Sequence, residues 1–225
     1  MKKKLGTTLL ISLAILSVGC NKSDVRTEIG IEYPLETITT VSSHKTIPSR
    51  DNALAEETNL TAGVFIVGQD IPEGRYVFTG DGIGTLSISE GEVVAINETI
   101  DSTTNEGVPT VTTDLYDGQK IEVLGLNNLN ITPAQTLVRT SLSTGNWVVG
   151  LDIQPGNYIC EPVMDSTEGS LKGRGTLIIY DGEMAVINEI LDSTGEEGVK
   201  DLRVELKAGQ TISIYNLPQV KFTEN

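Results

Sequence analysis

The chain has 225 residues, of which 38% are hydrophobic, and its 31 acidic and 16 basic side chains give a formal net charge of −15. An acidic chain is repelled by a polyphosphate backbone, so no nucleic-acid partner is expected. One histidine and two cysteines exclude zinc fingers, cysteine-rich disulfide frameworks and catalytic sites that need more than one histidine.

Residues 1–19 are predicted to be a lipoprotein signal peptide. Lysines at positions 2–4 precede an uncharged stretch, residues 5–19, which is shorter than the roughly 20 residues of a membrane-spanning helix. A glycine directly before Cys20 at the end of this stretch resembles the bacterial lipobox. The resemblance implies lipidation of Cys20, cleavage before it, and attachment to the extracytoplasmic face of the cell membrane through acyl chains. The alternative is an ordinary signal peptide that contains a cysteine.

Residues 20–60 are predicted to form a flexible tether. They are rich in Ser, Thr, Glu and Asp without a clear periodicity, and they include His44, the single histidine. Alternating apolar residues between Ile29 and Leu35 indicate a short strand within this segment. Removal of residues 1–19 deletes three lysines and no acid, which changes the net charge from −15 to −18. We therefore expect the folded part to stand off an anionic membrane surface.

An internal repeat defines the rest of the chain. Residues 67–76 match residues 149–158 at six of ten positions, and residues 82–108 match residues 173–199 at sixteen of twenty-seven. The offset changes from 82 to 91 because the second copy carries an insertion within residues 161–172. Two long copies indicate a duplication rather than a solenoid. We expect one β repeat over residues 61–133 and a second over residues 134–225.

Each copy is predicted to be all-β. Short runs of β-branched and alternating apolar residues are separated by Gly- and Asp-rich turns, and we find no convincing helical period after the signal peptide. This pattern predicts two tandem, duplicated small β-sandwich or barrel-like domains. Corresponding residues are expected in the two cores: Leu86, Ile88 and Ile121 in the first copy, and Leu177, Ile179 and Ile212 in the second.

The repeated motif Gly-x-Asp-Ile-Pro-x-Gly-x-Tyr begins at Gly68 and is followed by Gly-x-Gly-Thr-Leu from Gly82. It is similar to tandem β repeats in lipoproteins and secreted proteins of low-GC Gram-positive bacteria, a group of unknown function. The resemblance covers most of residues 64–224 and implies the repeat module but no particular activity. The second copy departs from the motif because Gln154 stands in place of Pro72 and a proline follows one residue later.

Two repeated clusters of oxygen-bearing side chains are the candidate sites for an ion or a polar ligand. Their members are Asn97, Glu98 and Asp101 in the first copy, and Asn188, Glu189 and Asp192 in the second. Carboxylate and amide oxygens are the ligands that Ca²⁺ prefers, but the spacing and glycine of an EF-hand loop are absent. We favour turn formation, in which Asp and Asn side chains accept hydrogen bonds from nearby backbone. No cofactor is expected.

The favoured function is therefore a membrane-anchored surface lipoprotein with a non-catalytic binding or structural role in the envelope. Its expected partners are the membrane, through the lipid on Cys20, and an unidentified protein or envelope polymer. The alternative is an extracytoplasmic hydrolase that uses the repeated acids as a glycosidase pair, which requires two carboxyl groups about 5–9.5 Å apart across a cleft. Cys160 is expected to be a small buried residue, and Trp147 and its counterpart Phe65 are expected to fill the cores.

Overall fold

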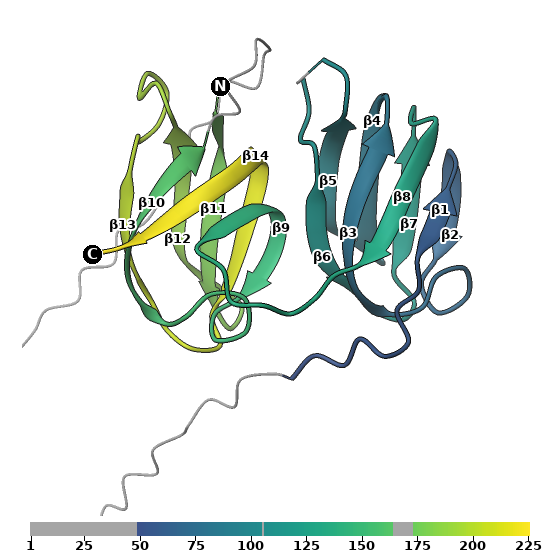
Figure 1. Ribbon diagram of the computed structural model, residues 1–225, viewed down its shortest axis with the longest axis horizontal. Helices are drawn as coiled ribbons and strands as arrows, with labels where there is room; N and C mark the ends of the chain where they lie inside the picture. Colours follow the sequence, from purple (N-terminus) through teal and green to yellow (C-terminus); the bar gives the residue numbers. More distant parts are fainter. Residues whose placement is uncertain (1–48, 105, 164–172) are drawn as a thin grey trace, which may run out of the picture. The chain divides into compact units, whose positions relative to one another are not determined.

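The computed structural model describes residues 49–104, 106–163 and 173–225. Within these ranges the chain has no helix and forms fourteen strands in two sheets, neither of which closes into a barrel (Figure 1). The predicted all-β fold class is therefore confirmed. The predicted signal peptide, Cys20, the strand expected between residues 29 and 35, and His44 lie outside the described residues. No described helix is long and apolar enough to cross a membrane.

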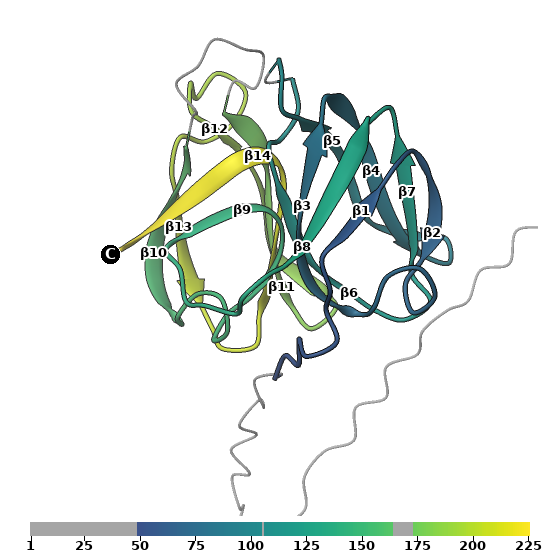
Figure 2. The same cartoon turned by 45° about the vertical axis from the view of Figure 1, so that its right-hand side comes forward.

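The N-terminal half contains the first eight strands. These are β1 (Thr58–Leu60), β2 (Gly63–Ile66), β3 (Gly74–Asp81), β4 (Ile83–Glu90), β5 (Val93–Asp101), β6 (Val111–Leu115), β7 (Lys120–Leu124) and β8 (Asn128–Pro133). Four of them form a complete sheet in the order β2-β7-β4-β5 (Figure 2). The other four pair in the order β1-β8-β3-β6 and begin the larger, ten-stranded sheet. One cluster of buried side chains from both sheets forms the core of this half.

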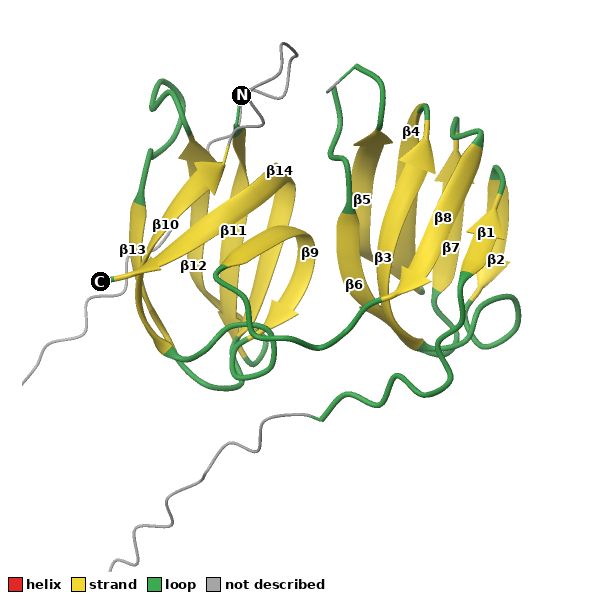
Figure 3. Cartoon of the chain, in the orientation of Figure 1, coloured by secondary structure: helices red, strands yellow, loops and turns green. Residues whose placement is uncertain are grey.

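The C-terminal half contains the remaining strands. These are β9 (Ser141–Val148), β10 (Gly156–Val163), β11 (Arg174–Asp181), β12 (Met184–Asp192), β13 (Leu202–Leu206) and β14 (Thr211–Glu224). The long strand β14 pairs with β9 along both of its ends, with β11 at its start and with β10 at its end (Figure 3). Its register shifts between Ile214 and Gln219, where Asn216 adopts a positive φ of 57°. A second cluster of buried residues forms the core of this half.

The two halves use the same pairing scheme. In the first, β2 pairs with β7, β7 with β4, and β4 with β5, and the equivalent pairs in the second are β9–β14, β14–β11 and β11–β12. In sequence, β9 spans the positions of β1 and β2, and β14 spans those of β7 and β8. The first half interrupts both strands, in one case at Gly125, whose φ of 79° turns the chain between β7 and β8.

Alternation along the strands places the predicted core residues inside. All six are at most 1% exposed, as expected: Leu86, Ile88, Ile121, Leu177, Ile179 and Ile212. Trp147 is also buried, at 4% exposed, whereas Phe65 is partly buried and packs against the first core. Each half therefore encloses its own apolar cluster between β strands, and burial of these side chains supplies the main driving force for folding.

A backbone contact joins the two halves. Thr112 on β6 and Gly145 on β9 form a parallel bridge, through which the large sheet runs from one half into the other. A Cβ atom at Gly145 would lie 1.9 Å from the carbonyl oxygen of Thr112, and its φ is 129°. Glycine is therefore required at this position both by the close approach and by the backbone conformation.

Residues 49–60, the last part of the predicted tether, take part in the fold. Strand β1 pairs with β8 in register from Thr58 to Leu60. Further upstream, Arg50 and Asn52 make hydrogen bonds to residues of both halves. A segment that is polar in composition is thus fixed by long-range contacts, which local sequence patterns do not reveal.

Candidate functional site

The first predicted acidic cluster forms the loop that follows β5. One carboxylate oxygen of Asp101 accepts hydrogen bonds from the backbone and hydroxyl of Thr103, at 2.7 and 2.9 Å, and from the backbone of Thr104 at 3.0 Å. The other accepts from the Thr104 hydroxyl at 2.5 Å and from the backbone of Glu106 at 2.7 Å. Both oxygens of the Asp101 carboxylate therefore accept hydrogen bonds from the loop that follows β5 and stabilise its conformation.

The second cluster is built in the same way. Asp192 accepts hydrogen bonds from the backbone and hydroxyl of Thr194 at 2.8 and 2.7 Å, and from the backbone of Glu197 at 2.9 Å. Gly198, which follows Glu197, allows the backbone to pass close to β12, because a Cβ atom at this position would lie 2.5 Å from the carbonyl oxygen of Ile190. The repeated Asp-Ser-Thr and Glu-Gly-Val segments thus form the two sides of one closed loop in each half.

The hydrogen bonds set the acidity of both aspartates. Burial raises the pKa of Asp101, but the hydrogen bonds from Thr104, Thr103 and Glu106 outweigh it and leave the pKa well below its usual value. For Asp192, the hydrogen bonds from Glu197 and Thr194 lower the pKa to about 2. Within residues 49–104, 106–163 and 173–225, no three His, Cys, Asp or Glu side chains are grouped closely enough to hold a metal ion.

The other members of the clusters do not come together. Asn97, Asn188 and Glu189 are exposed. Glu98, in contrast, is 4% exposed and accepts hydrogen bonds from the backbone N–H of Asn216 in the other half, at 3.3 and 3.2 Å. Burial raises the pKa of Glu98 to about 7, even though the hydrogen bond from Asn216 opposes the shift. Two equivalent positions in the repeat thus have different environments, and Glu98 belongs to the junction between the halves.

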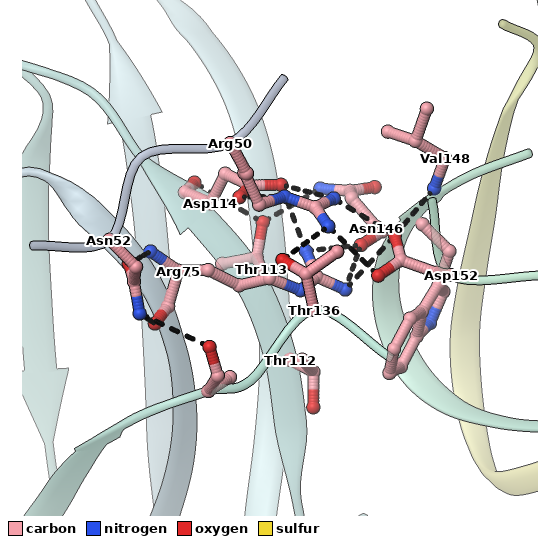
Figure 4. Close-up of polar contacts among 12 residues, drawn as sticks. Arg50, Asn52, Arg75, Thr112, Thr113, Asp114, Thr136, Asn146, Val148 and Asp152 are labelled. Atoms are coloured by element: carbon pink, nitrogen blue, oxygen red, sulfur yellow. Dashed lines mark hydrogen bonds and ion pairs between the residues drawn. The ribbon is translucent and has the colours of Figure 1, made fainter. Parts of the chain in front are cut away.

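A buried arginine is the centre of this junction (Figure 4). The Arg75 side chain is fully buried, and its Nη1 donates to Asp114 Oδ2 at 2.8 Å. Both terminal nitrogens also donate to the backbone oxygen of Asn146 in the C-terminal half, at 3.1 Å each. Nη2 lies 3.6 Å from an oxygen of Asp152, which is fully buried as well. Arg75 on β3 therefore bonds directly to residues of both halves.

Arg50, from the segment that precedes β1, completes the network. Its guanidinium donates to both oxygens of Asp152 at 2.8 and 2.9 Å, and its Nε lies 2.6 Å from Asp114 Oδ1. Two arginines and two aspartates thus form one cluster with no net charge, in which Arg75 and Asp152 are fully buried and Arg50 and Asp114 are partly buried. Such bidentate arginine–carboxylate pairs are geometrically specific, which fixes how the segment near residue 50 crosses both halves.

The pKa values of the two arginines are shifted in opposite directions by their surroundings. For Arg75, burial and the nearby Arg50 lower the pKa, although Asp114 and Asp152 favour the charged form. For Arg50, burial also lowers the pKa, but the hydrogen bonds and charges of Asp152 and Asp114 outweigh it and raise the pKa. Among the described residues, Arg75 Nε is the one buried side-chain nitrogen or oxygen without a hydrogen-bond partner.

An indole ring and an amide group complete the junction. The Arg75 guanidinium carbon lies 4.6 Å from the Trp147 ring centroid, and that of Arg139 lies 5.8 Å from it. Both distances allow cation–π attraction. Asn52 donates to the backbone oxygens of Arg75 and Ala134, at 3.2 and 3.1 Å, and accepts from the Arg75 backbone N–H at 2.6 Å. A cavity of about 300 Å³ lies beside Arg50, Arg75 and Asp114.

A second, wider pocket of about 720 Å³ lies at the turn between β2 and β3. Its lining includes four carboxylates, from Glu56, Asp70, Glu73 and Asp117, together with the exposed Leu54. Asp70 has a structural role here, because it accepts a hydrogen bond from the backbone of Ile66 at 2.7 Å. None of the described residues that line this pocket is basic, so the lining favours a cationic group over an anionic one.

The contacts of Arg75 between the two halves are not predicted by local sequence patterns, because they join residues far apart in the chain. Arg75 is separated from Asp114 by 39 residues and from Asn146 by 71. The differences between the copies carried a usable signal: Arg75 stands where the second copy has Asn157, and Trp147 stands where the first has Phe65. Where the two copies carry different residues at equivalent positions, the structural environments of those positions differ as well.

The remaining cysteine has the environment expected of a small apolar residue. Cys160 on β10 is 0% exposed and belongs to the core of the C-terminal half. Burial raises the pKa of its thiol to about 12, so the reactive thiolate is disfavoured at neutral pH.

Comparison of the chain with models of protein families and with curated proteins finds no match.

Proposed function

We propose that the protein is a lipid-anchored surface protein with a non-catalytic binding or structural role in the cell envelope. The anchor is Cys20, and residues 21–48 connect it to the β halves. The two β repeats, residues 61–133 and 134–225, arose by duplication, and the ionic cluster around Arg75 then joined the copies into one unit. The membrane and an envelope polymer or protein are its partners.

The observation that carries the non-catalytic assignment is the state of the repeated aspartates. Asp101 receives five hydrogen bonds from Thr103, Thr104 and Glu106, and Asp192 is bonded within its own loop in the same manner. A glycosidase instead needs two carboxyl groups that face a substrate across a cleft. The acidic pocket at Asp70 and Glu73 supports a binding role, with a cationic group as the ligand chemistry it suits.

The proposal is tested with the full chain expressed in a bacterium that processes lipoproteins. Wild type is compared with Cys20→Ala and with Cys160→Ala as a matched cysteine control. We expect wild type and Cys160→Ala in the membrane fraction and Cys20→Ala outside it, because the variant lacks acyl chains. Equal membrane association of all three variants contradicts the anchor. Release of sugar from envelope material by wild type, lost in Glu98→Gln, contradicts the non-catalytic role.

A further inference from the structure

A third, basic cavity of about 260 Å³ lies between the two halves, lined by residues of β3, β6, β9 and β14 and of the segment that links the halves. Its polar lining includes two arginines and four hydroxyl groups, those of Arg75, Arg139, Thr110, Thr112, Ser141 and Ser143. None of the described residues that line it is acidic, whereas both pockets described above contain carboxylates. In a chain with a net charge of −15, this lining distinguishes the basic cavity from its surroundings.

The basic cavity carries a positive charge that the junction does not neutralise. The cluster of two arginines and two aspartates around Arg75 has no net charge. Arg139 adds a third positive charge, and no carboxylate in the described part of the chain forms an ion pair with it. Three arginines are therefore matched by two aspartates, and the surplus charge lies at the basic cavity. An oxyanion is the group that such a guanidinium binds most specifically.

Arg139 is already held in place by the chain itself. Its Nη1 and Nη2 donate to the backbone oxygens of Leu137 and Gln135, at 2.9 and 3.1 Å, and its backbone N–H donates to the backbone oxygen of Asp152 at 2.7 Å. The Trp147 ring lies against the same guanidinium. Of the five N–H donors of a guanidinium, three thus have no partner among the described residues. Because the side chain is ordered, an anion that binds to it causes little further loss of entropy.

The uncharged polar groups of the basic cavity are the second part of the site. Thr112 and Ser143 share one hydrogen bond of 3.3 Å between their hydroxyls. The half-buried side chains of Thr110, Ser141 and Gln219 also line the cavity, and they form no hydrogen bond with any described residue. Arg75 has the buried Nε without an acceptor, and a buried donor of this kind is stabilised by any acceptor oxygen that reaches it. The lining can therefore bind hydroxyl groups as well as a charge.

We propose that the basic cavity binds a small hydroxylated molecule with a single oxyanion, about the size of one acidic monosaccharide. Arg139 holds the carboxylate or phosphate group, and the hydroxyl and amide side chains bind the hydroxyls of the ligand. A volume of about 260 Å³ is at the lower end for ligand sites, which suits one sugar unit. The net charge of −15 disfavours a polyanion, whose further charges would lie against an acidic surface. This inference does not depend on the lipid anchor.

Intrinsic fluorescence tests this binding directly. Trp147 is the single tryptophan of the chain and lines the basic cavity, so its emission reports on this place. The full chain, purified in detergent, is titrated at constant ionic strength with glucuronate, glucose 6-phosphate and glucose. We expect saturable binding of at least one of the two anions, and binding of glucose at least about tenfold weaker, because glucose forms no charge-assisted hydrogen bond. The two anions distinguish a carboxylate ligand from a phosphate ligand.

Variants of Arg139 test which residue binds the anion. Arg139→Gln should weaken binding of the anion at least about tenfold, and Arg139→Lys should have an intermediate effect because lysine keeps the charge but loses the planar donor fork. Arg203→Gln is the matched control, since it removes one positive charge from an exposed side chain on β13 and should bind as wild type does. Isothermal titration calorimetry measures all affinities without relying on the indole, and unchanged circular dichroism confirms that each variant is folded.

Three results would overturn the proposal. The first is equal affinity for glucose and for the anions, and the second is the absence of saturable binding of both anions by both methods. The third is binding by folded Arg139→Gln that equals binding by Arg203→Gln. Each of these results is independent of where the protein fractionates in the cell, so it can be told apart from a failure of the proposed envelope role.

Discussion

The carboxylate of Glu98 on β5 accepts hydrogen bonds from the backbone N–H of Asn216, 118 residues away in the other half, at 3.3 and 3.2 Å. Asn216 presents this N–H at the register shift of β14, where its φ is 57°. The carboxylate is buried, so its ionised form is disfavoured, and the pKa of Glu98 is raised to about 7. We therefore expect the contact between the two halves to depend on pH.

This pKa predicts the direction of the pH dependence. Because the folded state binds the Glu98 proton more tightly than the unfolded state, the free energy of unfolding falls as pH rises from about 4.5 to 7 and then levels off. The loss is on the order of 3 kcal/mol. We expect Glu98→Gln to remove this slope and to be more stable than wild type at pH 8, measured by urea unfolding from pH 5 to 8. Glu189→Gln, at the exposed counterpart, is the control, and an unchanged slope in Glu98→Gln contradicts the assignment.

Removing Arg75 is expected to be strongly destabilising. Arg75→Met leaves Asp114 and the buried Asp152 without one of their two partners, and breaking a buried ion pair in this way costs about 3–5 kcal/mol. The control is Arg174→Met, which removes the exposed pair with Glu197 and should cost about 0–1 kcal/mol. Urea unfolding of both variants provides the comparison. A similar loss of unfolding free energy in the two variants would show that the buried ionic network stabilises the fold no more than an exposed ion pair does.

The acidic loops are expected to respond to Ca²⁺ as they do to any salt. The Asp101 oxygens already accept hydrogen bonds from their own loop, so a cation would have to displace donors that are in place. We expect the thermal midpoint to rise equally in CaCl₂ and in NaCl of matched ionic strength, because both screen the acidic surface. A Ca²⁺-specific rise that is lost in Asp101→Asn/Asp192→Asn would instead identify an ion-binding site.

The same aspartates are expected to stabilise their loops. Asp101→Ala removes all five loop hydrogen bonds and should lower the thermal midpoint by about 3–6 °C. Asp101→Asn keeps one acceptor oxygen and should lose less. Differential scanning calorimetry at neutral pH measures both changes. A midpoint that is unaffected in Asp101→Ala would mean that these hydrogen bonds are no better than those the loop makes with water.

The elements that the sequence predicted are those that depend on local patterns. Alternation predicts the strands that bury Leu86 and Leu177, and local sequence predicts turns at the Asp-Ser-Thr segments, where Asp101 accepts hydrogen bonds from its own loop. The junction has no local pattern, since Arg50 lies 102 residues from Asp152 in a segment whose composition indicates a tether. The same reason explains why Glu98 and Glu189 were assigned alike: a repeat shows equivalent positions but not what packs against them.

The C-terminal half is expected to fold alone. Its apolar cluster is drawn entirely from residues between Leu142 and Phe222, so a fragment of residues 134–225 retains a complete core. We expect a β circular-dichroism spectrum and a cooperative melt at a lower midpoint than in the full chain, because the bonds from Arg50 and Arg75 are lost. A disordered spectrum would show that the two halves depend on each other for folding.

The most direct test of the proposed function is mass spectrometry of the mature N-terminus of the full chain, purified from the membrane fraction. The account predicts a peptide that begins at Cys20 and carries the added mass of a diacylglyceryl group, with the preceding nineteen residues absent. An unmodified Cys20, or a mature chain that begins at another residue, would contradict the lipid anchor on which the envelope assignment rests.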